Sequence, residues 1–315
     1  TGSAAIHAFK ANQNINVFIL HPHGKVSPMQ QKQMTTVDEE NIFNIAIEGN
    51  FDDCQKIVKT LFIDDEIQNR TSLTAINSIN WARLIAQVVY YFWSHLQINN
   101  KDINFIVPSG NFGNIFSAYV AKQMGLPINR LHVATNENDI LKSIITRGQM
   151  TKKTVSQTFS PSMDIQISSN FERQMFESFD RDSNQVNNAF NEFHKTGNYL
   201  FNSNIIDNFK KIYDASSIND DETLVTISKV FEKYNYISDP HTATGLKLLM
   251  DKNDNETWVS LACAHPAKFN TAVKKAINKE IDIPSELSNL FDKKENMTIL
   301  PNSTQEVKNY LLQNI

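Results

Sequence analysis

The chain has 315 residues, of which 41% are hydrophobic and 20% charged, and its formal net charge is −4. This length predicts two subdomains that share an interface, and this composition is typical of a well-packed soluble protein. The small negative charge supplies no basic field for nucleic acid or an anionic membrane, and no apolar run reaches the roughly 18 residues of a membrane span.

The two cysteines, Cys54 and Cys263, form neither a disulfide framework nor a metal-binding pattern. This usage favours a reducing compartment, and we expect a cytoplasmic protein. No signal peptide opens the chain, and Thr1 in place of Met indicates a fragment or a processed product.

The first 70 residues alternate between helices and short apolar strands. We predict a helix over 3–10, strands over 15–20 and 41–47, a helix that begins at Ser27 and Pro28, and another from Phe51 onward. Such alternation with short links indicates parallel strands with right-handed crossovers. Residues 1–70 are therefore predicted to form a smaller α/β subdomain.

A long helix is predicted from about residue 79 to 96, apolar on most of its circumference and so buried between layers. Asn77, Ser78 and Asn80 stand at its start, and Arg83 lies one turn inside. These side chains could hold a phosphate or a carboxylate. An N-cap cluster, with Arg83 paired to a surface acid, is an equally good interpretation.

An apolar strand, a turn and an amphipathic helix follow over residues 106–116. With Gly110 and Gly113 the turn can expose successive backbone N–H groups, and the helix directs its positive end to the same place, which predicts an anion site. The turn matches neither the dinucleotide fingerprint nor the Walker A loop. From these residues alone, a purely structural turn is as good an interpretation.

Residues 71–315 are predicted to form the larger α/β subdomain. Within it we expect a strand at 130–134, a surface insertion of short helices near 180–222, and a strand that runs into a helix over 258–269. Because parallel strands end at one edge of a sheet, the turns at 109–114 and 263–268 should share a rim.

Two histidines, His241 and His265, stand beside prolines near this rim. Each could be a general acid or base, although a histidine in such a place is more often a hydrogen-bonded structural residue. The sequence contains no recognisable metal-ligand set and no nucleophile elbow.

Nine runs resemble the threonine synthase family, in the family's order and over nearly the whole chain. They are Gly-Lys-Val-Ser-Pro (24–28), Gly-Asn-Phe-Asp-Asp-Cys-Gln (49–55), Asn-Ser-Ile-Asn-Trp-Ala-Arg (77–83), Val-Pro-Ser-Gly-Asn-Phe-Gly-Asn (107–114), Ala-Thr-Asn-Glu-Asn-Asp (134–139), Ser-Pro-Ser-Met-Asp-Ile (160–165), Ser-Ser-Asn-Phe-Glu-Arg (168–173), Asp-Pro-His-Thr-Ala (239–243) and Ala-His-Pro-Ala-Lys-Phe (264–269).

The resemblance implies a pyridoxal-phosphate enzyme of the tryptophan-synthase-β-like fold, a carbon–oxygen lyase of threonine biosynthesis. It would convert O-phospho-L-homoserine and water into L-threonine and phosphate. The family position that faces the pyridine nitrogen falls at Cys263, where the family usually has Thr; a thiol is a weaker hydrogen-bond partner than a hydroxyl. The residues implied to hold the cofactor phosphate are Gly110, Asn111, Phe112, Gly113 and Asn114.

The resemblance also implies two places for the substrate. Asn77, Ser78 and Arg83 would contribute to the pocket for the substrate phosphate. Thr1 and Gly2 look like the tail of the family's Ser-Gly-Asp-Thr-Gly turn, which cradles the substrate carboxylate. No nucleic acid and no membrane is expected as a partner.

The family's Phe-Lys-Asp segment, whose lysine forms the Schiff base with the cofactor, has no counterpart in residues 1–315. Lys10, Lys25 and Lys32 lie in runs that match other parts of the family pattern. That lysine is both covalent anchor and proton shuttle. We therefore expect an N-terminally truncated enzyme that cannot turn over, with an exposed apolar surface that favours self-association.

Two other interpretations stay open at this stage. One is a non-catalytic homologue that binds phosphorylated small molecules. The other is a different pyridoxal-phosphate lyase, such as a threonine dehydratase, against which the cluster at 77–83 argues because it suits a phosphorylated substrate.

Overall fold

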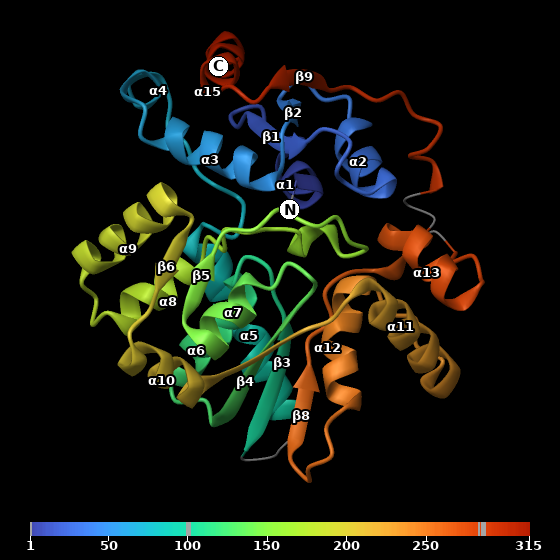
Figure 1. The fold of residues 1–315 in the computed structure, drawn as a ribbon. Helices are drawn as coiled ribbons and strands as arrows, with labels where there is room; N and C mark the ends of the chain where they lie inside the picture. The colour runs from blue at the N-terminus through green and yellow to red at the C-terminus, as the bar shows by residue number, and fades with distance from the viewer. Residues whose placement is uncertain (1, 99–101, 283, 285–287) are drawn as a thin grey trace. The chain divides into compact units, whose positions relative to one another are not determined.

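The computed structural model describes residues 2–98, 102–282, 284 and 288–315. It divides into two compact units (Figure 1): unit 1 is Thr1–Asn80 with Asp282–Ile315, and unit 2 is Trp81–Ile281. Each unit is built on an open parallel sheet, which confirms the predicted α/β class. No helix in the described ranges is both long enough and apolar enough to cross a membrane.

The sheet of unit 1 has three parallel strands in the order β1-β2-β9. Local signals start its helices: a capping box links Ser27 to Gln30 at one helix and Asn50 to Asp53 at the next. The elements are α1 (Gly2–Phe9), β1 (Val17–Pro22), α2 (Pro28–Thr35), β2 (Ile42–Glu48), α3 (Phe51–Phe62), α4 (Asp65–Arg70), β9 (Thr298–Pro301) and α15 (Thr304–Gln313).

The end of the chain belongs to unit 1, so its predicted place in the larger subdomain is wrong. Strand β9 pairs with β2, where Thr298 lies opposite Ile45. Helix α15 contributes Val307 and Leu311 to the core that also contains Ile57 of α3. Parallel pairing between strands some 250 residues apart is decided by packing and leaves no local sign in the sequence.

The main sheet of unit 2 has four parallel strands in the order β7-β4-β3-β8, and β5 pairs with β6 antiparallel. The described elements are α5 (Trp81–Ile98), β3 (Ile103–Pro108), α6 (Gly113–Gln123), β4 (Ile128–Thr135), α7 (Ile140–Arg147), β5 (Gln149–Thr151), η1 (Pro161–Met163), α8 (Phe171–Ser178), α9 (Ser183–Thr196), β6 (Asn198–Leu200), α10 (Ser203–Ile212), β7 (Tyr213–Ser217), α11 (Asp220–Tyr234), α12 (Pro240–Met250), β8 (Thr257–Ser260), η2 (Pro266–Phe269) and α13 (Asn270–Ile277).

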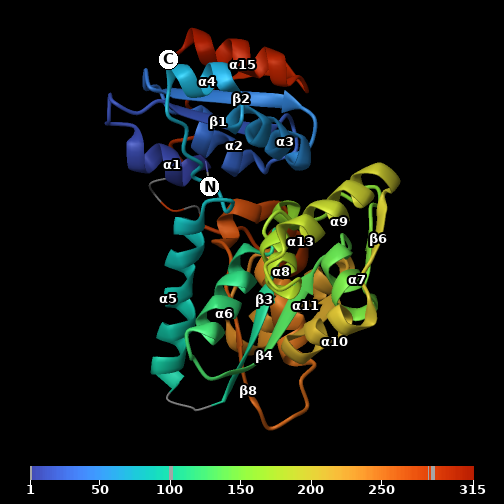
Figure 2. The ribbon, with the colours of Figure 1, turned by 90° about the vertical axis from the view of Figure 1, so that its left-hand side faces the viewer.

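Helices cover both faces of this sheet because its central strand is apolar on both sides. Phe105 and Val107 of β3 join the core that α5 and α6 complete, whereas Ile106 packs with Leu248 of α12. Helices α5 and α6 lie together beside β3 and β4 in Figure 2.

The long helix is less buried than its sequence predicts. One side of α5 packs into the core through Leu84, Val88 and Tyr91. Another side is exposed, with Trp93 at 62% and Leu96 at 69%. The prediction that α5 is buried between layers is therefore wrong for the described structure.

The stretch near 180–222 is no surface insertion. It contains α9, α10 and the sheet strand β7. Phe193, Phe209 and Tyr213 are almost wholly buried in the main core of unit 2. Because many Asn residues separate these aromatic side chains, the apolar pattern of the segment is weak in the sequence although its packing is not.

Candidate functional site

Two loops leave the carboxyl ends of neighbouring strands in unit 2. The glycine loop (residues 109–114) follows β3, and the Cys263 loop (residues 261–265) follows β8. These strands are parallel neighbours, and the Leu261 N–H donates to the Ile106 carbonyl at 3.0 Å. Both loops thus lie at one edge of the sheet, as the sequence predicts, and this is the edge where open α/β sheets bind ligands.

The glycine loop leads into helix α6, which begins at this edge of the sheet without a side-chain cap. The Ser109 N–H donates to the Ala134 carbonyl at 2.8 Å, which fixes the loop to β4. Helix α6 begins at Gly113, and Phe112 at its N-cap makes no side-chain hydrogen bond to the first turn. A helix start without a side-chain cap leaves backbone N–H groups and the positive end of the helix dipole for an anion.

Phe112 adopts a left-handed backbone conformation, with φ of 62°. Its ring is completely buried and meets Phe171 and Tyr213 edge to face, with centroids 5.1 and 5.5 Å apart. A non-glycine residue in this region costs about 1–3 kcal/mol and persists only where its surroundings enforce it. The aromatic pocket supplies that enforcement, so the loop is held in one shape before any ligand arrives.

Gly110 is required by close packing. A Cβ atom there would lie 3.0 Å from both the Met163 Cα and the Ser162 carbonyl oxygen. The segment at 160–164 therefore packs directly against the glycine loop. A side chain at position 110 would force this segment and the loop to move apart.

Polar groups around the loop hold its asparagines. The Asn111 carbonyl accepts the Asn170 N–H at 3.1 Å, and the hydroxyl of the fully buried Tyr91 donates to Asn114, 2.8 Å from its Oδ1. Burial raises the pKa of Tyr91 well above its usual value, so this hydroxyl stays a donor. Ser168 Oγ and Asn170 Nδ2 are buried donors with no hydrogen-bond partner among the described residues. A spare buried donor on Asn170, whose N–H bonds to the glycine loop, suits an anionic ligand at the uncapped helix start.

Sequence reasoning assigned no role to Tyr91, Ser168 or Asn170. Tyr91 sits at an ordinary core position of α5, so nothing in the sequence distinguishes its hydroxyl. The polar run at 168–170, just before the helix that begins at Phe171, is a sequence signal for a binding site. It contains more hydrogen-bonding side chains than one N-cap needs.

Cys263 stands at the same edge on the other loop. Its backbone N–H donates to Thr242 Oγ at 2.8 Å. The residue as a whole is exposed, and yet the protein packed around the thiol, with the negative charge of Asp239, raises the pKa of the thiol to about 12. Cys263 is therefore a neutral donor at physiological pH. Cys54 is also a free cysteine, buried in unit 1.

The structure describes the residues predicted to bind the substrate only in part. Thr1 lies outside the described residues. Asn77 and Ser78 belong to unit 1, where Asn77 Oδ1 accepts the Ile79 N–H at 3.0 Å, and Arg83 lies in the first turn of α5 in unit 2. Their assignment to one site stays a prediction.

Both histidines near the rim have hydrogen-bonding roles. His265 caps η2, where its Nδ1 accepts the Ala267 N–H at 3.2 Å. His241 is buried and bonded to Asp239. Within the described ranges, no group of three or more His, Cys, Asp or Glu residues could hold a metal ion.

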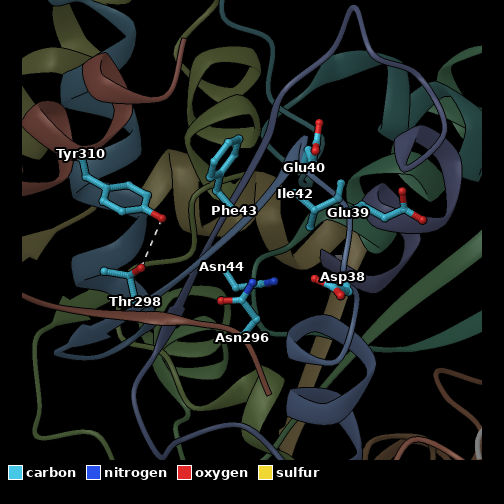
Figure 3. A pocket seen from close by; sticks show the side chains of 9 residues that line it. All are labelled: Asp38, Glu39, Glu40, Ile42, Phe43, Asn44, Asn296, Thr298 and Tyr310. Carbon is cyan, nitrogen blue, oxygen red and sulfur yellow. Dashed lines mark hydrogen bonds between the residues drawn. The ribbon is translucent and has the colours of Figure 1, made fainter. Parts of the chain in front are cut away.

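A cavity of about 450 Å³ lies in unit 1, at the start of β2 (Figure 3). Asp38, Glu39 and Glu40 contribute three carboxylates to its wall, and the Thr298 hydroxyl donates to the Tyr310 hydroxyl oxygen at 3.2 Å. Like charges repel, so this cavity does not suit a phosphorylated ligand, and the glycine loop remains the candidate anion site.

Comparison with known proteins identifies the relatives of this chain. The family model described as "Threonine synthase, C-terminal" matches residues 242–311. The threonine synthase of Pseudomonas aeruginosa is 42% identical over 318 residues, which cover 99% of this chain and 68% of that protein. The threonine synthase of Saccharomyces cerevisiae is 41% identical and is covered to 66%.

Solved structures agree as well. The pyridoxal-phosphate-bound threonine synthase of Brucella melitensis superposes with a TM-score of 0.87 at 44% identity, over 99% of this chain and 68% of that one. The Escherichia coli threonine synthase superposes with a TM-score of 0.86 at 31% identity. The chain thus spans about two thirds of the length of its relatives. At this identity and coverage, the chain belongs to the threonine synthase family.

Proposed function

We propose that this chain carries the cofactor-binding residues of a pyridoxal-phosphate-dependent threonine synthase, which converts O-phospho-L-homoserine and water into L-threonine and phosphate. The observation that carries the proposal is the uncapped start of α6 behind the glycine loop, because it lies where the resemblance to the threonine synthase family implies the cofactor phosphate.

The residues at this edge fit the cofactor. Gly110 to Asn114 would receive its phosphate, with backbone N–H groups of the loop and of the first turn of α6 as donors. The close packing at Gly110 and the buried conformation of Phe112 support a preformed cradle. When bound, pyridoxal phosphate supplies an electron sink for negative charge that develops on the substrate's carbon atoms.

Cys263 would face the ring nitrogen of the cofactor. Because the pKa of its thiol is about 12, the thiol keeps its proton near pH 7 and offers that proton as a hydrogen bond. It does not protonate the ring outright, since it is far too weak an acid. The chain therefore provides a neutral contact at this point.

The substrate would bring a second phosphate. As the family resemblance implies, we propose Asn77, Ser78 and Arg83 as contacts of this phosphate and Thr1 as a contact of the substrate carboxylate. A guanidinium with neighbouring amide and hydroxyl donors suits a phosphate monoester, and the charge of Arg83 supports this choice over an unphosphorylated substrate.

A polypeptide of these 315 residues should not turn over. The Phe-Lys-Asp segment that would supply the anchoring lysine does not occur in residues 1–315. The polypeptide would bind the cofactor noncovalently, and it would lack the amine that moves protons among the substrate's carbons. Conversion of O-phosphohomoserine by this polypeptide would contradict the proposal.

Retention of the cofactor tests the site directly. We would measure the dissociation constant of pyridoxal phosphate by equilibrium dialysis and absorbance, and compare wild type with Gly110→Ala. The added methyl group meets backbone atoms at 3.0 Å, so retention should weaken at least tenfold.

Gly197→Ala is the matched control. Gly197 ends α9 with φ of 76°, has nothing within 4 Å of its Cβ position, and should cost about 1 kcal/mol of stability without touching the loop. Equal loss of retention in both variants, or retention that survives Gly110→Ala, would argue against a phosphate site at the glycine loop.

We also propose self-association of this polypeptide through the exposed side of α5. Trp81, Ile85, Val89, Trp93 and Leu96 recur at helical spacing, and every one of them is more than two-fifths exposed. A continuous apolar stripe of this kind favours contact with a second copy.

A further inference from the structure

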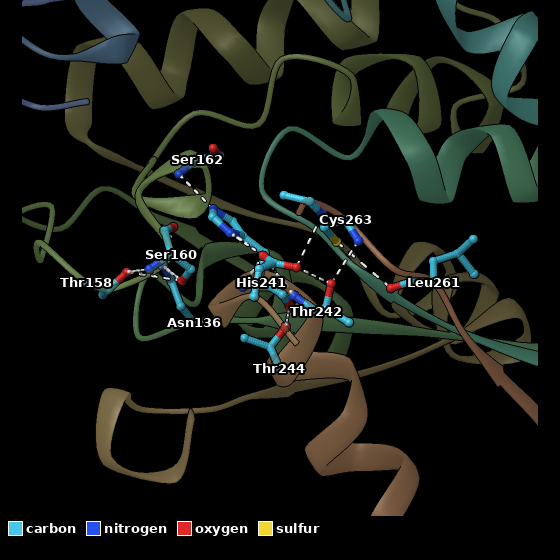
Figure 4. A network of polar contacts seen from close by, with 11 residues as sticks. Asn136, Thr158, Ser160, Ser162, His241, Thr242, Thr244, Leu261 and Cys263 are labelled. Carbon is cyan, nitrogen blue, oxygen red and sulfur yellow. Dashed lines mark hydrogen bonds and ion pairs between the residues drawn. The ribbon is translucent and has the colours of Figure 1, made fainter. Parts of the chain in front are cut away.

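Several backbone and side-chain donors of unit 2 converge on one carboxylate, that of Asp239. Figure 4 labels His241, Thr242 and Cys263 of this network. Asp239 is the N-cap of α12 and is 1% exposed. Its Oδ1 accepts the His241 N–H at 2.9 Å and His241 Nδ1–H at 2.8 Å. Its Oδ2 accepts the Thr242 hydroxyl and the Ala264 N–H, the latter at 3.2 Å.

The first connection runs to the Cys263 loop. Thr242 donates its hydroxyl hydrogen to Asp239, so the lone pairs of its oxygen are left to accept, and one of them receives the Cys263 N–H at 2.8 Å. Together with the Ala264 N–H on Asp239, this fixes two consecutive peptide units of the loop. The carboxylate thus determines where the backbone of Cys263 lies.

The second connection runs toward the glycine loop. Because His241 Nδ1 donates to the carboxylate, Nε2 is free to accept, and it receives the Ser162 N–H at 3.3 Å. The carbonyl oxygen of Ser162 is one of the atoms 3.0 Å from the Cβ position of Gly110. Asp239 therefore reaches both sides of the candidate site.

Such an arrangement is costly to keep unless the carboxylate is ionised and fully hydrogen-bonded. Burial by itself raises the pKa of Asp239, but the hydrogen bonds from His241 and Thr242 outweigh it and hold the pKa below its usual value. The charge-assisted bonds that result are stronger than neutral ones, which suits a group that must hold two loops in place.

We propose that Asp239 is a positioning residue of the cofactor site, which acts through Thr242 on the loop that faces the ring and through His241 on the segment that packs against the phosphate loop. This inference rests on the proposed function for its consequence, but its structural half can be tested without any cofactor.

The experiment uses two buried threonines of α12. Thr242→Val removes the hydroxyl that joins Asp239 to Cys263, and Thr242→Ser restores it. Thr244→Val is the control, because Thr244 is equally buried and donates its hydroxyl to the His241 carbonyl at 2.8 Å without reaching the Cys263 loop. Hydrogen–deuterium exchange would be followed in peptides that cover residues 261–265, and pyridoxal phosphate retention by equilibrium dialysis.

For Thr242→Val we expect exchange in these peptides and the cofactor dissociation constant each to rise about tenfold, the size of effect that one lost hydrogen bond produces. Thr242→Ser should return both to within about twofold of wild type. Thr244→Val should lower the melting temperature comparably and leave both readouts nearly unchanged.

Two results would overturn the inference. One is equal exchange and retention in the two valine variants, which would make Thr242 merely structural. The other is unchanged exchange at residues 261–265 in Thr242→Val. If wild type itself fails to retain pyridoxal phosphate, the proposed function fails, and the exchange comparison still decides whether Asp239 positions the loop through Thr242.

Discussion

Tyr91 and Tyr213 form a natural pair for testing the glycine loop at the scale of single residues. Both are fully buried, and each hydroxyl has a protein partner: Tyr91 donates to Asn114, and Tyr213 donates to Gln174 Oε1 at 2.6 Å. Only the first of these bonds fixes a residue that we assign to the cofactor phosphate.

We expect Tyr91→Phe and Tyr213→Phe each to lower the free energy of unfolding by about 1 kcal/mol, the usual net value of a hydrogen bond. Only Tyr91→Phe should weaken pyridoxal phosphate retention, by roughly three- to tenfold, because it releases Asn114. Urea unfolding and equilibrium dialysis on both variants check this. Equal pyridoxal phosphate retention in the two variants would mean that Asn114 does not contribute to cofactor binding.

Single residues differ in how well sequence could anticipate them. The turn at Gly110 to Gly113 and the helix start behind it could be predicted because two glycines before an amphipathic helix are a local signal, whereas the binding of an anion there stays a prediction. The left-handed conformation of Phe112 could not, since it depends on Phe171 and Tyr213 from two other elements. The hydrogen bond that Asp239 accepts from the Ala264 N–H is equally non-local; the sequence indicates only the place of Asp239 before a helix.

Helix α5 offers a prediction at the scale of an element. Val89 lies in the middle of its apolar stripe and is 60% exposed. Val89→Glu should preserve the helix, since Glu is a good helix former, and weaken self-association at least tenfold, because burying an unpaired carboxylate is costly.

Sedimentation velocity over a range of concentrations measures this effect. Val225→Glu is the matched control, since it adds the same charge at an exposed valine of α11. A wild-type polypeptide that stays monomeric at high concentration, or an equal effect of the two substitutions, would contradict the proposed contact.

Elements could be predicted where their signals are local. The starts of α2 and α3 follow from capping residues, and β1 to β4 follow from apolar runs between turns. The exposure of α5 could not be predicted. A helix that is apolar on most of its circumference favours burial on all sides, but its sequence does not identify the surface that would bury each side. The membership of β9 in the first sheet depends on pairing with distant β2.

At the scale of the whole molecule, the described cores stay within single units. The core around Phe105 and Tyr213 belongs to unit 2, and those around Ile47 and Ile19 belong to unit 1. The chain has three tryptophans, Trp81, Trp93 and Trp258, and all of them lie in unit 2. Tryptophan fluorescence therefore reports the unfolding of unit 2 alone.

His132 makes the stability of unit 2 depend on pH. It lies buried in β4, bonded to Ser216 and close to Trp258, and burial lowers the pKa of its ring to about 4, with Lys252 adding to the effect. In the unfolded chain the pKa is about 6.5, so the unfolded state binds the proton first as pH falls. The contribution of the neutral His132 ring to the free energy of unfolding is fully present above pH 6.5. It is lost as the pH falls from 6.5 to 4, by up to about 3 kcal/mol.

His132→Gln replaces the ring by an amide that can still bond to Ser216, and it removes the titrating group. Urea unfolding followed by tryptophan fluorescence should show wild type losing about 2–3 kcal/mol more than the variant between pH 7.5 and 4. All other titrating groups are common to the two proteins, so the difference isolates His132. If wild type and variant lose equal free energy of unfolding, the His132 ring accepts a proton in the folded unit. Burial in β4 would then desolvate the ring less than its low exposure indicates.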